Sequence, residues 1–402
     1  MKKVNCMLLL ALSVAVTTLT NSCSEDSGGI EPIRIEFSQA QQTDFAACGN
    51  DFANNLLATL SNQQGERSLN VVVSPVSVQY LVSMMANTAS DEAREEAFAA
   101  LGISNYTLAQ ANQHNKELLD RLQQDDQYVK VALANSIWAS EAFYMSAELR
   151  QAIANSYNAD IAYHDFANKA SEAKALIDKW ASEKTHGLVS RMSITPSPST
   201  ALILANATYF NGKWSQPFNG KDTHPGTFYN EDNTTSQVSM MAKTMTAKVY
   251  ADDDISVTEL TYGRGYYSMM IVMPKDIQQQ LTERTDWWGL HNKLVTANNV
   301  EIILPKFKAE SNWEDLVEVC KALGVRKLFD QADSGVKFVE MGQNAMIEVD
   351  ENGTKAAAAS AARGEFTSPE APSRICFDHP FVYAIRENTT GTILFIGKTG
   401  KL

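Results

Sequence analysis

Cysteine and histidine are scarce in this sequence, and neither residue type is grouped. The 402 residues include five cysteines, at positions 6, 23, 48, 320 and 376, and six histidines. No two cysteines have the Cys-x-x-Cys spacing of a zinc or redox site, and the three after position 23 do not make a disulfide framework. We therefore expect no metal and no cofactor, and we expect these three cysteines to be small core residues.

Sequence motifs of catalysis are also missing. There is no Gly-x-Ser-x-Gly nucleophile turn and no His-Glu-x-x-His zinc motif. The stretch from Gly391 to Thr399 resembles a phosphate-binding loop only superficially, because five residues instead of four separate Gly391 from Gly397. The sequence therefore predicts a protein that is not an enzyme.

Basic residues are outnumbered by acidic ones. There are 34 lysines and arginines against 47 aspartates and glutamates, which gives a net charge of -13. An acidic surface repels phosphate groups, so we expect no nucleic acid as partner. Hydrophobic residues make up 44% of the chain, enough for a large buried core. We find no internal repeat and no second domain boundary.

Long apolar runs are absent except near the N-terminus. Lys2 and Lys3 precede an apolar stretch over residues 7–16, which is too short to span a bilayer. The following Leu19-Thr20-Asn21-Ser22-Cys23 resembles a bacterial lipoprotein cleavage box. This resemblance implies a signal peptide over 1–22, a lipidated Cys23 and a polar tether over 23–33. The chain would then be lipid-anchored to the bacterial cell envelope, at the outer membrane and exposed at the cell surface. The alternative is an ordinary secretory signal and a secreted protein.

The spacing of apolar residues predicts several helices and strands. Apolar residues at helical spacing indicate an amphipathic helix over 45–60. A buried strand over 70–73 is followed by Ser74 and Pro75, which suit a helix start. Further strands are predicted over 131–138, 268–274 and 300–307 and around 239–241.

An alanine-rich segment over 351–368 has two interpretations. Its helix propensity is high, and its composition alone favours a surface helix or a flexible loop. Read with a period of two, it has a face of small uncharged residues and a face that carries the charges Lys355 and Arg363. The small face consists of Thr354, Ala356, Ala358, Ser360 and Ala362. A strand that enters a packed sheet needs this pattern, and no proline before Pro369 prevents it.

The segments around this stretch resemble the serpin family. Residues 377–386 and 391–398 resemble the C-terminal hairpin of serpins, and Glu351-Asn352-Gly353-Thr354 with the alanines resembles their hinge. Residues 70–77, 177–189 and 205–214 resemble further segments of the family, in the same order. The resemblance covers about residues 40–402. It implies an α+β serpin domain over 34–402, with a large central β-sheet, two further sheets, about nine helices and an exposed reactive-centre loop at about 351–372.

The resemblance implies a protease inhibitor that acts as a suicide substrate. A serine protease, or a papain-like cysteine protease, would attack the loop and form an acyl-enzyme. The freed segment would then enter the main sheet as a new strand and trap the protease. The expected partner of this monomeric protein is thus a protease, with membrane contact through the N-terminal lipid only. A non-inhibitory binding protein with the same fold is the alternative.

The resemblance also assigns roles to individual residues. The hinge set is Glu351, Gly353, Thr354, Ala356, Ala358 and Ser360. The residues at the centre of the sheet (the shutter) and at its entrance (the breach) are Ser74, Ser77, Asn206, Trp214, Lys306 and Gln343. Lys306 and Glu351 match an ion pair of the family. Gln343 stands where many members have a histidine, and we expect its side chain to bond to Asn206 without pH sensitivity.

The position of the cleaved bond follows from a count along the loop. The family places its hinge glutamate roughly seventeen residues before the cut, which gives Thr367–Ser368. Cleavage after Thr367 suits elastase-like or subtilisin-like enzymes, and it places Phe366 where papain-like proteases prefer a large apolar side chain. Cleavage after Phe366 would suit a chymotrypsin-like pocket and is the second choice. Cleavage after Arg363 would suit a trypsin-like pocket and is the third choice, because it shortens the inserting strand.

Overall fold

The computed structural model describes residues 43–62, 68–122, 126–329, 339–354 and 373–402. Within these residues the chain forms nine helices and fifteen strands. The helices are α1 (Asp44–Ser61), α2 (Pro75–Ala86), α3 (Asp91–Ala100), α4 (Leu108–Leu122), α5 (Ala147–Tyr157), α6 (Phe166–Lys184), α7 (Ile277–Glu283), α8 (Trp287–Lys293) and α9 (Leu316–Ala322). The α+β class predicted from the sequence is confirmed.

Six strands form the main sheet, in the order β10-β11-β12-β4-β2-β3. Their bounds are β2 (Val129–Ser140), β3 (Ala159–His164), β4 (Leu202–Lys213), β10 (Phe307–Trp313), β11 (Val339–Asp350) and β12 (Gly353–Thr354). At one end of the sheet β12 lies between β11 and β4 and pairs with both. Towards the other end β11 and β4 pair directly with each other, from Val339↔Leu202 to Asn344↔Ala207. Of the described residues, Gly353 and Thr354 therefore lie between β11 and β4 at one end of the sheet, and the two strands are paired directly towards the other end.

The second sheet has nine strands, in the order β1-β15-β14-β8-β7-β6-β9-β13, with β5 on β6. Their bounds are β1 (Asn70–Val73), β5 (His224–Tyr229), β6 (Thr235–Ala251), β7 (Ile255–Tyr262), β8 (Tyr267–Pro274), β9 (Val295–Pro305), β13 (Ser373–Cys376), β14 (Phe381–Glu387) and β15 (Ile393–Thr399). The sequence predicted two further sheets besides the main sheet. In the structure these two are joined into one sheet by β6, which belongs to both. This 17-residue strand pairs with β5 near its start and with β7 near its end. Its pairing with β9 has a register shift between Met245 and Ala247.

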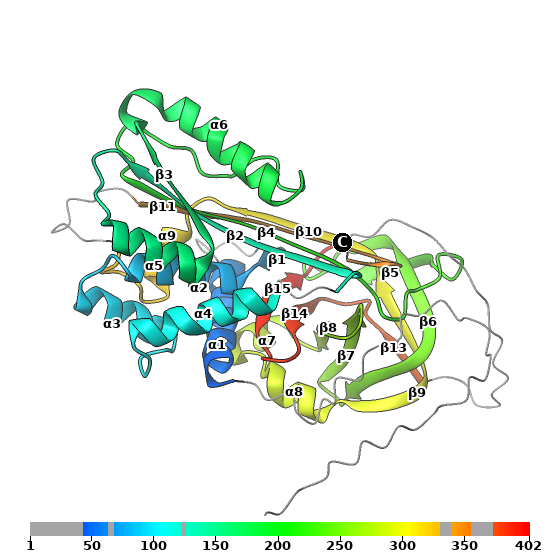
Figure 1. Cartoon of the computed structure of the whole chain (residues 1–402). Coiled ribbons are helices and arrows are strands. Elements are labelled where there is room, and N and C mark those ends of the chain that lie inside the picture. Colours follow the sequence, from blue (N-terminus) through cyan, green and yellow to red (C-terminus); the bar gives the residue numbers. More distant parts are fainter. Residues whose placement is uncertain (1–42, 63–67, 123–125, 330–338, 355–372) are drawn as a thin grey trace, which may run out of the picture.

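Helix α2 fills the space between the two sheets. It contacts β2, β4 and β11 on one side and β15 on the other, and all twelve of its residues are buried. Figure 1 shows α1, α2 and α4 on one face of the main sheet and α6 on the opposite face. Because both faces are covered, β4 is buried along almost its whole length.

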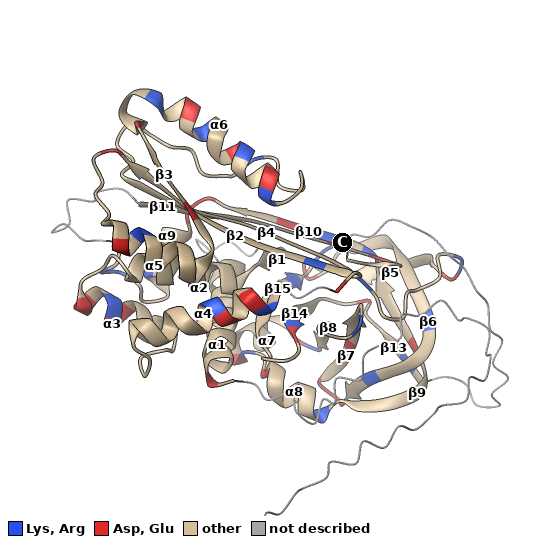
Figure 2. Cartoon of the chain, in the orientation of Figure 1, with Lys and Arg blue, Asp and Glu red and all other residues tan. Residues whose placement is uncertain are grey.

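Helix α6 builds a second, smaller core on the outer face of the main sheet. Its Phe166, Ile177 and Trp180 pack with Trp138 of β2 and Ile203 of β4. Figure 2 shows that α6 carries charges of both signs, whereas β4 beneath it has no charged residue before Lys213. The helix therefore has the polar outer face and apolar inner face expected of a surface helix.

Most predicted elements are confirmed, with one correction. The helix predicted over 45–60 is α1, and the strand predicted over 70–73 is β1. The strand predicted over 300–307 is in fact divided. β9 ends at Pro305, the Lys306 N–H donates to Ser239 O (2.8 Å), and Phe307 begins β10 in the other sheet. Pro305 still pairs with Met240 of β6, and the chain leaves β6 for the main sheet directly after the Lys306 bond.

Two further expectations concern cysteines and membranes. Cys320 is buried as predicted, whereas Cys48 and Cys376 are only partly buried, and the three thiols are free. Burial raises the pKa of the Cys320 thiol far above its ordinary value, so this residue is an inert core side chain. In the part of the chain that the structure describes, none of the helices has the length and apolar character needed to cross a bilayer.

Candidate functional site at the entrance and centre of the main sheet

The hinge begins with a tight turn that only glycine can make at its third residue. Gly353 has φ +149°, and a Cβ at this position would lie 2.0 Å from the carbonyl oxygen of Gly212. The Asp350 carboxylate accepts hydrogen bonds from the N–H groups of Asn352 (2.7 Å) and Gly353 (3.2 Å). This turn directs the chain back between β11 and β4.

Thr354 is the last described residue of the hinge, and its side chain faces the interior. It is fully buried, and its hydroxyl lies 2.7 Å from the hydroxyl of Tyr262 in β7. The inward position of Thr354 agrees with the period-two pattern of the sequence. The remaining residues of the predicted small face, Ala356, Ala358 and Ser360, lie outside the described residues.

Trp214, directly after β4, donates two hydrogen bonds to the main chain of the hinge turn. Its main-chain N–H donates to Asn352 O (2.8 Å) and its indole N–H donates to Asp350 O (3.0 Å). The indole stacks on the ring of Tyr262, with centroids 4.3 Å apart. Trp214 is 1% exposed, so these contacts are shielded from water. The sequence placed Trp214 at the entrance of the sheet, and the structure brings it into contact with both ends of the turn.

The predicted ion pair between Lys306 and Glu351 is present. The Lys306 ammonium lies 2.9 Å from the Glu351 carboxylate, and their side chains are 40% and 15% exposed. Thr223 donates a second hydrogen bond to Glu351 (2.8 Å). Burial alone would raise the pKa of Glu351, but the hydrogen bonds from Lys306 and Thr223 outweigh it and lower this pKa. The neighbouring Asp350 has the opposite shift, because burial, together with the Glu351 charge, raises its pKa.

A chain of buried hydrogen bonds crosses the centre of the main sheet. The Ser74 and Ser77 hydroxyls lie 2.8 Å apart, and Ser77 lies 2.8 Å from the hydroxyl of Thr208. Thr208 in turn donates to the amide oxygen of Asn206. Asn206 donates to Asn135 of β2 (2.8 Å), and Asn135 donates to Tyr157 O (2.9 Å). This polar chain joins the start of α2 to β4, β2 and the end of α5.

Gln343 joins the same region through a partner other than the predicted one. It lies beside Asn206 in the parallel register of β11 and β4. Its side chain, however, accepts from Ser74 N (2.8 Å) and donates to Ser74 O (3.0 Å). The predicted bond to the Asn206 side chain is wrong, because Gln343 points towards α2 and is within reach of the Ser74 main chain. Ser74 occupies the N-cap position of α2 but makes no side-chain capping bond, because its hydroxyl bonds to the Ser77 hydroxyl instead.

Sequence reasoning missed several members of these two regions. Thr208 follows Asn206 by two residues in a strand, so alternation places both on one face and could have indicated it. Asn135, Tyr262 and Thr223 gave no comparable signal, because their partners are 71, 92 and 128 residues away in the chain. Cys23, Arg363, Phe366, Thr367 and Ser368 lie outside the described residues, so their assignments stay predictions.

Known proteins resemble this chain over nearly its whole length. The profile of the family described as serpin (serine protease inhibitor) matches residues 47–401. The chain belongs to the serpin family. Iripin-3 of Ixodes ricinus is 30% identical over 378 residues, which are 88% of this chain and 93% of that protein. Serpin B8 of Homo sapiens is 29% identical over 375 residues, 88% of this chain and 98% of that protein.

Solved serpin structures share the fold. AtSerpin1 of Arabidopsis, in a conformation described as native and stressed, superposes with a TM-score of 0.76 at 26% identity and covers 90% of this chain and 99% of its own. Thyroxine-binding globulin in complex with thyroxine has a TM-score of 0.80 at 22% identity and covers 89% of this chain and 99% of its own. Members of the family are generally protease inhibitors and not enzymes, but the latter neighbour, which has the same fold, binds thyroxine.

Proposed function

We propose that this serpin inhibits a serine endopeptidase as a suicide substrate. The observation that carries the proposal is the state of the main sheet. Gly353 and Thr354 of the hinge lie between β11 and β4, and towards the other end of the sheet the two strands pair directly with each other. A sheet that admits the start of a strand and is closed below it has room for a more stable, fully inserted arrangement.

In the proposed mechanism the serine hydroxyl of the protease attacks the carbonyl carbon of Thr367. The bond between Thr367 and Ser368 breaks, the new amine of Ser368 takes the proton, and Thr367 stays bound to the protease as an ester. The segment from Gly353 to Phe366 then enters between β11 and β4 and carries the protease along. Insertion must separate the six parallel residue pairs from Val339↔Leu202 to Asn344↔Ala207.

The inward hinge residue favours inhibition over the alternative function. A strand can insert rapidly only if its inward side chains need little space and carry no charge, because a buried charge must lose its hydration. Thr354 meets this condition and already occupies its inserted position. A non-inhibitory binding protein stays the second candidate, because thyroxine-binding globulin shares the fold.

The finer assignments are part of the same proposal. The target is an elastase-like or subtilisin-like serine protease. Chymotrypsin-like serine proteases and papain-like cysteine proteases are the next candidates. The reactive bond of the inhibitor follows Thr367, with Phe366 as the second choice and Arg363 as the third. The protein acts as a monomer that is lipid-anchored through Cys23 to the bacterial envelope, at the outer membrane. The sequence features described above support these assignments.

The test is incubation with an elastase-like protease, followed by electrophoresis in hot detergent and N-terminal sequencing. We expect a covalent complex that survives boiling, together with a released fragment that begins at Ser368. Clean cleavage without a complex would contradict inhibition and favour the binding-protein alternative. A fragment that begins at Gly364 would move the reactive bond to Arg363 and the target to trypsin-like enzymes.

A further inference from the structure

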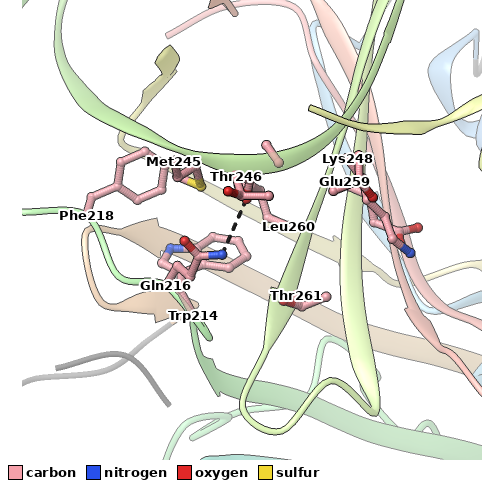
Figure 3. Close-up of a pocket in the computed structure, with 11 residues that line it drawn as sticks. Trp214, Gln216, Phe218, Met245, Thr246, Lys248, Glu259, Leu260 and Thr261 are labelled. Carbon is pink, nitrogen blue, oxygen red and sulfur yellow. Dashed lines mark hydrogen bonds and ion pairs between the residues drawn. The ribbon is translucent and has the colours of Figure 1, made fainter. Parts of the chain in front are cut away.

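A cavity of about 180 Å³ lies beside Trp214, between the segment after β4 and strands β6, β7 and β9. Its apolar walls are the buried side chains of Trp214, Phe218, Met245 and Leu260. The rim is polar and uncharged, with exposed Gln216, Thr246 and Thr296. Figure 3 shows the Gln216 amide beside Thr246, to whose main-chain oxygen it donates (3.4 Å). A ligand would therefore pass uncharged groups on its way to an apolar interior.

The two charged residues in the cavity wall, Lys248 and Glu259, are already paired with each other (3.4 Å). The Glu259 carboxylate is fully buried and also contacts Arg386 (2.5 Å) and His291 (3.1 Å). An anion in the cavity would meet the charge of Glu259, and a cation would meet that of Lys248, so neither ion would find a counter-charge of its own. Because an ion must also lose its hydration on entry, the cavity favours an uncharged ligand.

The volume and the walls of the cavity fit a single aromatic ring. An apolar cavity of about 150 Å³ holds benzene, whereas drug-sized ligands occupy roughly 300 Å³ or more. The indole of Trp214, the phenyl ring of Phe218 and the thioether of Met245 each make favourable contacts with an aromatic ring. A saturated ring of the same size lacks the electrostatic part of these contacts.

We propose that this cavity binds an uncharged monocyclic aromatic compound, with its ring against Trp214 and Leu260. Trp214 belongs both to the cavity and to the hinge region, because its indole N–H donates to Asp350 O and its main-chain N–H donates to Asn352 O. A ring packed against the indole holds it in this position and so stabilises the turn at Gly353. Binding does not depend on the proposed inhibition of a protease, so the two proposals can fail separately.

Ligand-observed NMR titration of the intact protein tests the charge and the size of the ligand. Benzyl alcohol should saturate with a Kd on the order of 1 mM. Benzylamine and benzoate have the same ring but carry opposite charges at neutral pH, and both should bind at least about fivefold more weakly. The two-ring 2-naphthylmethanol and the saturated cyclohexylmethanol should also bind more weakly, by about threefold or more. Any of these four probes binding as tightly as benzyl alcohol, or no saturation by about 10 mM benzyl alcohol, would overturn the proposal.

A matched pair of variants tests the place of binding. Thr296→Tyr adds a ring at the exposed rim and should abolish binding of benzyl alcohol. Thr235→Tyr adds the same ring at an exposed position at the start of β6 that does not line the cavity, and it should leave the Kd unchanged. Near-ultraviolet circular dichroism checks that both variants are folded. Undiminished binding to folded Thr296→Tyr would refute the assignment of the site to this cavity.

Hydrogen exchange tests the link between the cavity and the hinge. Exchange of the peptide that contains Gly353 and Thr354 should slow when benzyl alcohol is bound to the wild-type protein or to Thr235→Tyr. The same concentration of benzyl alcohol should not slow it in Thr296→Tyr. Unchanged exchange in the saturated wild-type protein would contradict the stabilisation of the hinge turn through Trp214.

Discussion

The entrance and the centre of the main sheet are held closed by different chemistry. At the entrance a half-exposed ion pair, Lys306–Glu351, and the buried contacts of Trp214 fix the hinge. At the centre, six residue pairs of β11 and β4 and a chain of uncharged hydrogen bonds from Ser74 to Asn135 hold the strands together. The stability of the entrance therefore depends on charge, whereas the stability of the centre depends on buried polar groups keeping their hydrogen-bond partners.

This difference explains how the main sheet can stay closed before cleavage and still open quickly in the proposed mechanism. A solvent-screened ion pair contributes about 1 kcal/mol or less and is lost without a large penalty. An orphaned polar group at the centre costs about 1–3 kcal/mol until a new strand supplies a partner. An inserting strand that satisfies those groups converts the penalty into stabilisation. In the proposed mechanism, opening would therefore start at the entrance, and the centre would open only as the strand arrives.

The largest effect is expected from a charge on the inward face of the hinge. Thr354→Arg would place a guanidinium in the fully buried site beside Tyr262. Because this buried site cannot solvate a charge, the hinge should be displaced from between β11 and β4 before cleavage. Insertion would then have to bring the charge back into the sheet, so it should become slower than deacylation, and the inhibitor should turn into a substrate. The stoichiometry of inhibition should rise by about tenfold or more. Lys355→Glu, on the face predicted to point outward, is the control and should change the stoichiometry little.

The second effect concerns a buried hydrogen bond at the centre. Gln343→Leu keeps the volume of the side chain but leaves the Ser74 N–H without its acceptor. The free energy of unfolding should fall by about 2 kcal/mol, measured by denaturant titration. Gln237→Leu is a matched control, because this exposed strand glutamine makes one bond to Thr227 (3.0 Å). Its effect should stay within about 0.5 kcal/mol, and equal losses in both variants would refute the special role of the centre.

A pH titration compares the uncharged centre of the main sheet with a charged cluster of the second sheet. This cluster consists of Glu259 and its partners Arg386, His291 and Lys248. Burial alone would raise the pKa of Glu259, but Arg386 and His291 outweigh it and lower this pKa to about 2. Because the folded pKa is below the unfolded value, the stabilisation is complete above about pH 4.5 and is lost as the pH falls towards 2. The difference in stability between wild type and Glu259→Gln should therefore shrink across this window, by on the order of 2–3 kcal/mol. A difference that does not change between pH 5 and pH 2 would contradict the assignment.

The smallest effect on stability is expected at the ion pair of the entrance. Glu351→Lys replaces an attraction to Lys306 by repulsion and removes the acceptor of Thr223. The free energy of unfolding should fall by only about 1 kcal/mol, but mild heating should now produce polymers or a loop-inserted latent form. Glu310→Lys breaks an exposed pair of the same length, Lys308–Glu310 (2.9 Å), away from the hinge. Native electrophoresis after heating should show monomer for this control, and monomer for both variants would remove the proposed role of the pair.

The fold was largely predictable from local patterns and from the resemblance of several segments. A short apolar run correctly placed β1, strand-forming composition correctly placed β8, and the small side chain of Thr354 correctly indicated an inward hinge face. The partner of Gln343 was not predictable, because it depends on how the start of α2 sits under β11. The division of the strand over 300–307 was missed because residues of strand-forming composition stand on both sides of Pro305. Local patterns thus give the faces of strands, whereas hydrogen bonds between distant segments follow only from the packed structure.

The most direct test of the account compares thermal unfolding before and after a single cut in the loop. If the main sheet is closed but able to accept the loop, the cleaved protein should unfold at a temperature higher by roughly 20 °C or more. Thr354→Arg should show a much smaller rise, because the strand cannot enter completely. An unchanged or lower unfolding temperature of the cleaved wild-type protein would contradict the central claim that the native sheet is held short of its most stable arrangement.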